Sequence, residues 1–125
     1  LSLNPGFFNA YRFLFSSWLA AGRLDARLLS KALASGDKAL ILASLSVLTE
    51  ISSTVIDKVF LSHSAKGIVS LIWCAHLPMQ LAVQIQQRMG GISPAEIIEV
   101  GKNGEYPFTD DEMKFQISSF TSGSA

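Results

Sequence analysis

The chain is short of charged side chains. Only 16% of its 125 residues are Asp, Glu, Lys or Arg, whereas about a quarter of a typical globular domain is charged. Ten basic residues balance ten acidic ones, so the formal net charge is zero. Because long-range attraction to nucleic acid requires a positive field, we expect no nucleic-acid partner. The low charge also predicts apolar surface that another protein, a second copy or a membrane covers.

Cysteine is almost absent. Cys74 stands alone, which excludes an intrachain disulfide and favours a reducing, intracellular and cytoplasmic setting. Its neighbours Ile72 and Trp73 predict a buried structural thiol, because burial raises a thiol pKa and lowers its reactivity. The two histidines, His63 and His76, have no Cys or carboxylate at ligand spacing, so we expect no metal site.

Groups that could act together in catalysis are also missing. Glu50 and Asp57 are two helical turns apart, too far for direct pairing. The segment 101–104 (GKNG) lacks the glycine spacing and the Lys-Ser or Lys-Thr pair of a phosphate-binding loop. Acids in a first helical turn are what the helix dipole favours, which explains Asp110, Asp111 and Glu112. The sequence predicts no catalytic residue and no cofactor, and hence a protein that is not an enzyme.

The longest uncharged stretch, residues 67–87, organises the prediction of the fold. Its length allows a transmembrane helix. However, helical spacing separates a polar stripe of His76, Gln80, Gln84 and Gln87 from an apolar side of Leu71, Ala75, Met79, Ala82 and Met89. This pattern favours an amphipathic core helix over about 67–89. Pro78 removes one backbone hydrogen bond, so we expect a kink near Ala75 or a break into two helices.

The preceding part of the chain predicts three helices. Asn4 and Pro5 begin a strongly aromatic helix over about 5–21. A short helix over about 25–34 ends at Gly36. Asp37 then begins a helix over about 37–62 that is apolar around most of its circumference, with a narrow polar strip of Ser46, Glu50, Ser53 and Asp57. Helices of this kind are central in a bundle.

The last third of the chain leaves two alternatives open. Ser93 and Pro94 favour a short helix to about residue 100, followed by a loop and another helix. Residues 97–108 could instead form a hairpin with Asn103 and Gly104 in its turn. Thr109 begins the final helix with a capping-box pattern, whose apolar surface comes from Met113, Phe115, Ile117 and Phe120.

Two stretches resemble parts of known families. Residues 28–52 resemble the helix-turn-helix rhythm of armadillo and HEAT units, which implies partner binding on a solenoid surface. They span about one unit, and one unit cannot bury its own faces. Residues 93–113 resemble the helix, glycine, Phe-Thr and acidic-helix pattern of leader-peptide domains in precursors of modified bacterial peptides. Each resemblance covers a minor part of the chain, so we carry no function over from either.

We therefore predict a single all-α domain over 1–121, with a mobile tail at 122–125. Five to six helices surround two central apolar helices at about 37–62 and 67–89. The predicted function is a non-enzymatic interaction or assembly domain, adaptor or oligomeric subunit, whose partner is another protein or a second copy. The candidate interaction surface comprises Phe8, Phe13, Phe15, Gln80, Gln84 and Gln87. The alternatives are a membrane-associated or membrane-embedded helical subunit, with hydrophobic segments at 39–56 and 67–85, and a carrier of an apolar small ligand.

Overall fold

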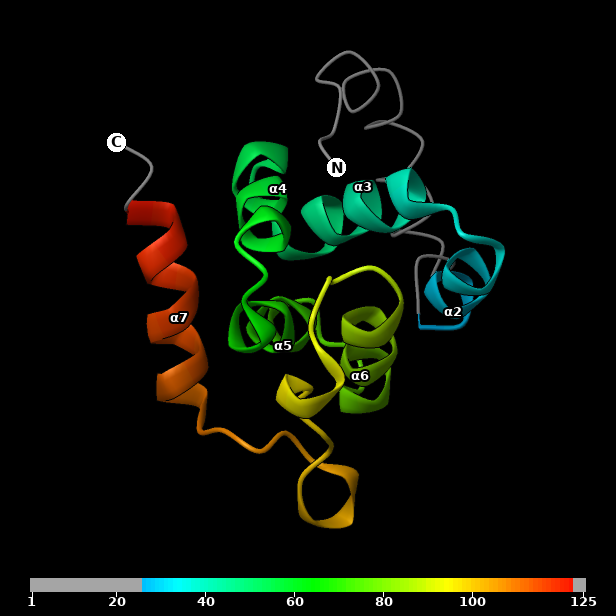
Figure 1. Cartoon of the computed structure of the whole chain (residues 1–125). Coiled ribbons are helices and arrows are strands. Elements are labelled where there is room, and N and C mark those ends of the chain that lie inside the picture. Colours follow the sequence, from blue (N-terminus) through cyan, green and yellow to red (C-terminus); the bar gives the residue numbers. More distant parts are fainter. Residues whose placement is uncertain (1–25, 123–125) are drawn as a thin grey trace.

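The protein is all-α in its computed structural model, which describes residues 26–122 (Figure 1). Six α-helices and no strand lie within those residues, and the predicted fold class is confirmed. The helices are α2 (Ala26–Ser35), α3 (Lys38–Thr49), α4 (Ser53–Leu61), α5 (Ala65–Cys74), α6 (Met79–Arg88) and α7 (Asp110–Ser122). The aromatic helix expected at 5–21 lies outside the described residues, and with it Phe8, Phe13 and Phe15.

Helix α5 lies at the centre of the bundle and packs against α3, α4, α6 and α7 (Figure 1). Every residue of α5 from Gly67 to Ile72 is buried, which explains why this part of the chain carries no charge. All six helices contribute large side chains to the core, and the fully buried ones are Leu29, Ile41, Leu42, Leu45, Ile56, Ile68, Leu71, Ile72, Met79, Ile85 and Met113.

The turn between α2 and α3 follows its local sequence signals. Gly36 has a φ of 77°, a left-handed conformation that glycine adopts without steric cost. Asp37 caps α3, and its carboxylate accepts a hydrogen bond of 3.2 Å from the backbone N–H of Leu40. Both predicted boundaries are confirmed, and the turn brings α2 back against α3.

The single helix expected over 37–62 is wrong, because the chain breaks between α3 and α4. Glu50 has a left-handed φ of 59°. Hydroxyl groups replace the helical bonds around it: Thr49 Oγ1 donates to Leu45 O at 2.6 Å, and Ser46 Oγ donates to Ile51 O at 2.5 Å. Ser52 then caps α4. Ser and Thr side chains compete with the helix for backbone groups, and here they end it. Ser46 is buried in this role, not on a polar strip.

The break expected near Pro78 is confirmed. Helix α5 ends at Cys74, and His76 takes a left-handed φ of 60°. The Leu77 N–H donates to Ile72 O at 3.1 Å, the bond that closes a Schellman-type helix end. Pro78 then precedes α6 in an extended conformation, where its missing N–H removes no helical bond. The uncharged stretch thus folds back on itself as the α5–α6 pair.

Residues 91–109, which we call the strap, form neither the short helix nor the hairpin. The predicted helix after Ser93 is reduced to a 3-10 turn at Pro94–Glu96, with no side-chain cap. A second 3-10 turn at Lys102–Gly104 has Asn103 at a φ of 60°. No strand is found anywhere in residues 26–122. A 3-10 turn uses i to i+3 bonds of poorer geometry, so the strap depends on bonds to the helices it crosses.

Helix α7 returns from the strap to pack against α5 and α4 (Figure 1). Met113 is its most buried residue, at 1% exposure. Gly67 allows the close approach to α5, because a Cβ at that position would stand 3.0 Å from Phe120 Cε2. The helix extends to Ser122, one residue into the expected tail, and 123–125 lie outside the described residues.

Candidate functional site

The structure divides the predicted glutamine stripe between two places. Gln80, Gln84, Gln87 and His76 are all exposed. Gln80 lies beside the strap, since a Cβ on Gly104 would stand 2.9 Å from its Nε2. Gln84 and Gln87 lie further along α6 and face α2. Among the members of the candidate surface within residues 26–122, Gln84 and Gln87 therefore share a concave site.

That site is a hollow of about 330 Å³ between α2 and α6, which we call the α2–α6 hollow. Leu33 is buried and lies at its base, while its other lining residues are exposed. The complete lining is Ser30, Leu33, Ala34, Gln84, Gln87 and Arg88. It thus combines a small apolar base with amide and guanidinium groups around it.

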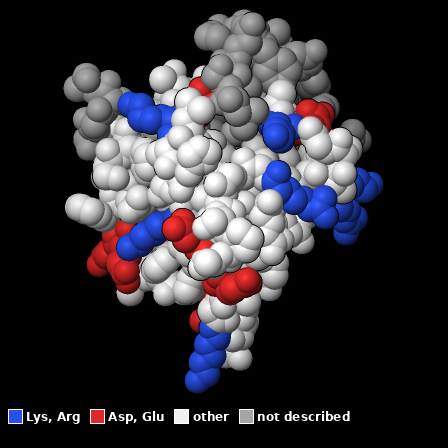
Figure 2. Space-filling view, viewed as in Figure 1, with Lys and Arg blue, Asp and Glu red and all other residues white. Residues whose placement is uncertain are grey.

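One basic side chain lines the hollow, and two more are exposed on α2. Arg88 contributes to its lining from the last turn of α6. Arg27 and Lys31 are exposed on α2, at helical spacings that place them on the same side as Ser30 and Ala34. Figure 2 shows Lys and Arg gathered along the right-hand edge, where α2 lies. The surroundings of the hollow therefore attract negative charge.

Acidic side chains gather on a different part of the molecule. Over residues 96–112 the strap and the first turn of α7 hold six acidic residues and one basic residue, Lys102. All six are exposed: Glu96, Glu99, Glu105, Asp110, Asp111 and Glu112. Figure 2 shows acidic atoms gathered at the lower left and lower centre of the molecule, with basic atoms among them. Within the described residues, the strap and the first turn of α7 therefore have a local excess of negative charge.

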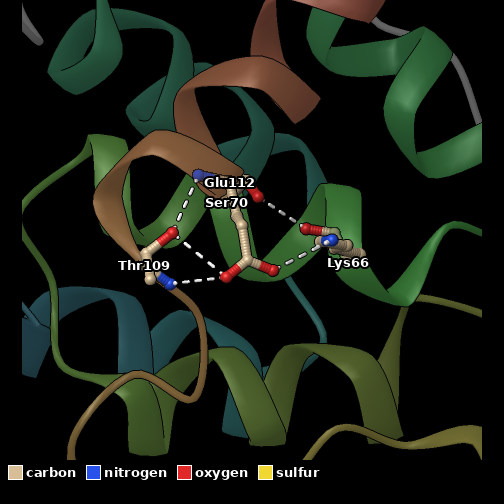
Figure 3. Close-up of polar contacts among 4 residues, drawn as sticks. All are labelled: Lys66, Ser70, Thr109 and Glu112. Carbon is tan, nitrogen blue, oxygen red and sulfur yellow. Dashed lines mark hydrogen bonds and ion pairs between the residues drawn. The ribbon is translucent and has the colours of Figure 1, made fainter.

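Thr109 and Glu112 form the capping box that begins α7 (Figure 3). Glu112 Oε1 accepts from Thr109 N at 3.2 Å and from Thr109 Oγ1 at 3.0 Å, and Thr109 Oγ1 accepts from Glu112 N at 3.1 Å. These bonds to Thr109, chiefly the backbone one, lower the pKa of Glu112 below its usual range. The predicted capping box is confirmed.

Lys66 joins this capping box to α5. Its Nζ lies 3.6 Å from Glu112 Oε2 and 4.8 Å from the ring centre of Phe108. Ser70 Oγ donates to the Lys66 carbonyl at 2.8 Å (Figure 3). Among the described side chains, Lys66 and Glu112 form the one ion pair. The cluster has a structural role, because it holds the first turn of α7 against α5.

Phe115 is the most exposed large apolar side chain of the described residues, at 74%. Of the four residues expected to give α7 its apolar surface, Met113 is buried, Ile117 and Phe120 are half-buried, and Phe115 is exposed. The sequence spacing indicates this exposure, because Phe115 stands two positions after the buried Met113 and so faces nearly away from it. Phe115 therefore projects outward, one turn after Asp111.

Gln86 is a second residue that sequence reasoning missed. It is fully buried, unlike the other glutamines of α6. Its Oε1 accepts from Ile98 N at 2.8 Å, and its Nε2 donates to Ile98 O at 3.0 Å and to Ala82 O at 3.2 Å. At helical spacing Gln86 lies on the same apolar stripe as Ala82 and Met89, and this position in the sequence indicates that it is buried. Gln86 holds the strap to α6.

The thiol of Cys74 and the phenol of Tyr106 are both partly buried. Cys74 is half-buried, and burial raises its pKa. Tyr106 donates to Leu77 O at 2.5 Å, and burial raises the pKa of its phenol. Residues 26–122 contain no group of three or more His, Cys, Asp or Glu side chains placed to hold a metal ion. Nor do they contain a helix of the length and apolarity needed to cross a membrane.

Comparison with known proteins adds no relative. The chain matches no protein-family model, no curated protein and no solved structure. The function must therefore be argued from the hollow, the charge distribution and Phe115.

Proposed function

We propose that the chain is a non-enzymatic helical interaction domain that binds another protein chain through the outward face of α7. The observation that carries the proposal is Phe115, which is 74% exposed on a helix whose apolar face is already packed. Binding energy at protein interfaces concentrates in a few large side chains with polar residues around them. Phe115, with Asp111 one turn before it, has this arrangement.

Two further features support an interaction domain. The chain has few charged residues for its size, and it carries a hollow with a small apolar base. Both suit a surface that another protein covers. The lone thiol of Cys74 suits a reducing, cytoplasmic compartment. A second copy of the chain is the first partner to test, because it requires no other component.

The proposal is tested by molar mass from light scattering after size-exclusion chromatography, over a range of protein concentrations. We expect the mass of the wild-type chain to rise with concentration and Phe115→Ser to remain monomeric. Leu61→Ser is the matched control, because Leu61 is also an exposed apolar side chain, at 54%, at the end of α4. It should associate like the wild type.

A monomeric wild type would direct the test to another protein. A photo-reactive residue at position 115 should then crosslink to one discrete protein in the source cells, and the same residue at position 61 should not. Association that Phe115→Ser leaves unchanged, or the absence of any position-specific crosslink from a monomeric chain, contradicts the proposal.

A further inference from the structure

We infer that Phe115 of one copy occupies the α2–α6 hollow of a second copy, so that copies associate head to tail. The inference rests on the proposed function, that α7 binds a protein chain, and adds both the partner and the site that receives Phe115. It depends on three observations: the size and lining of the hollow, the charges around it, and the positions of the two surfaces on the molecule.

The hollow suits one aromatic ring. Its volume is about 330 Å³, and a protein cavity of about 150 Å³ holds a benzene molecule. Leu33 offers apolar contact at the base of the hollow, and the exposed methyl group of Ala34 adds to it, while the rest of the lining is polar. The guanidinium of Arg88 is available to stack on a ring face, an arrangement that stabilises cation–π pairs. Gln84 and Gln87 can keep their amides at the rim, in contact with water.

Asp111 is the charge next to Phe115 that complements the hollow. It lies one helical turn before Phe115 on the same side of α7 and is in no ion pair within the described structure, whereas Asp110 faces away and the exposed Lys114 directly precedes Phe115. Arg88 lines the hollow and has no ion-pair partner among the described residues, and Arg27 and Lys31 are exposed on α2 nearby. When Phe115 enters the hollow, Asp111 comes near Arg88. Opposite charges across an interface orient the partners and speed their encounter.

Phe115 cannot reach the α2–α6 hollow of its own copy. Figure 1 shows α7 and α2 on opposite sides of the molecule, with α5 and α3 between them. Phe115 must therefore enter the hollow of another copy. Because the two surfaces differ, the contact is heterologous, and repeated contacts generate an open chain or a closed ring.

The test combines two variants that each remove one side of the contact. Phe115→Ser removes the projecting side chain and keeps the hollow. Ala34→Trp fills the hollow and keeps Phe115. Each variant alone should be monomeric, with at least a tenfold weaker self-association than the wild type. An equimolar mixture should form a dimer of one copy of each, because intact Phe115 then meets an intact hollow.

Ala39→Trp is the matched control, because Ala39 is exposed on α3 and does not line the hollow. It should associate like the wild type. Dimer formation in the mixture also shows that Ala34→Trp is folded, since a misfolded chain would not present Phe115 correctly.

The other outcomes overturn the inference in distinguishable ways. If Ala34→Trp associates like the wild type while Phe115→Ser does not, Phe115 binds elsewhere, and the proposed function stands without the hollow. A mixture without a dimer, or a wild type that is monomeric at every concentration, also overturns the head-to-tail contact. If Phe115→Ser associates like the wild type, both proposals fail.

Discussion

Gln86 shows how much one buried amide can contribute. It satisfies both backbone groups of Ile98, which otherwise have no regular secondary structure to pair with. Its burial is energetically acceptable because the amide itself is bonded, whereas an unpaired buried polar group costs about 1–3 kcal/mol. The same residue type at the next position on α6 should cost little to replace, because Gln87 is exposed.

Replacing Gln86 by Leu should therefore lower the free energy of unfolding by about 2–4 kcal/mol, because two backbone groups of the strap lose their partner. Urea denaturation followed by circular dichroism measures the change. Gln87→Leu is the control and should stay within about 0.5 kcal/mol of the wild type. Equal urea midpoints for the two variants would show that the strap does not depend on Gln86.

The second residue-scale prediction concerns Glu112. Bonds from Thr109 lower its pKa, so the folded state favours the ionised carboxylate. Its stabilising contribution is thus present above the unfolded pKa, near 4.5, and is lost as the pH falls through the lower folded pKa. A carbon-detected NMR titration of the carboxyl group should place the folded pKa below 4.5.

Thr109→Ala should raise that pKa toward its usual value, because it removes the side-chain bond. The backbone bond, which is the largest cause of the shift, remains in this variant. Lys66→Met should also raise the pKa, since it removes the attraction of the Lys66 ammonium. An unchanged pKa in Thr109→Ala would mean that the Thr109 hydroxyl does not control the charge of Glu112.

At the scale of whole helices, the sequence predicted the ends that local signals determine. Gly36, Asp37 and Thr109 end or begin helices through bonds to residues three or four positions away, and such signals are visible in a short window. The end of α3 at Glu50 was missed because the apolar period continues across the break. The hydroxyl bonds of Ser46 and Thr49 end the helix, although both side chains look like ordinary helical residues.

The strap could not be predicted for a related reason. Its supports come from far along the chain: Gln86 is 12 residues from Ile98, and Tyr106 is 29 residues from Leu77. Tertiary contacts of this kind override local preference, and here they replace the helix favoured by Ser93 and Pro94. A single sequence without tertiary contacts carries no record of these pairs.

The docking of α7 leads to the third prediction. Met113 is the one fully buried side chain among residues 110–121 of α7, so Met113→Ala should destabilise the protein by about 2–5 kcal/mol through the cavity it leaves. Lys114→Ala, at an exposed neighbouring position, should have little effect. Thermal unfolding measures the stability. Hydrogen exchange should quicken most in the amides of α7, and exchange that quickens equally in α2 would contradict local loosening.

At the scale of the whole molecule, the amino-acid composition does not reveal where the charged residues lie. The sequence gives equal numbers of acidic and basic residues, and zero net charge was interpreted as the absence of a directing field. The structure distributes the charges unevenly, with an excess of acids on the strap and the first turn of α7 and three bases on or near α2, namely Arg27, Lys31 and Arg88. Likewise, Gln84 and Gln87 were predicted as surface residues, but the hollow exists only because α2 packs against α6, about 50 residues along the chain.

This uneven distribution makes the proposed self-association dependent on salt. Salt screens exposed charges over about 10 Å at 0.1 M and about 3 Å at 1 M. Attraction between Asp111 and the bases around the hollow should therefore weaken as salt rises. We expect the dissociation constant of the wild type to increase by about three- to tenfold between about 0.05 and 0.5 M sodium chloride, as measured by sedimentation velocity.

Arg88→Glu separates this electrostatic effect from apolar contact. The substitution reverses one charge at the hollow and leaves Leu33 and Phe115 in place. It should weaken association at low salt and reduce the salt dependence, because screening then removes repulsion as well as attraction. Lys58→Glu, the same kind of charge reversal on α4 away from the hollow, should leave the salt dependence close to that of the wild type. Association that strengthens with salt in the wild type would show that apolar burial alone drives it, and Asp111 would then have no part in orienting the two copies.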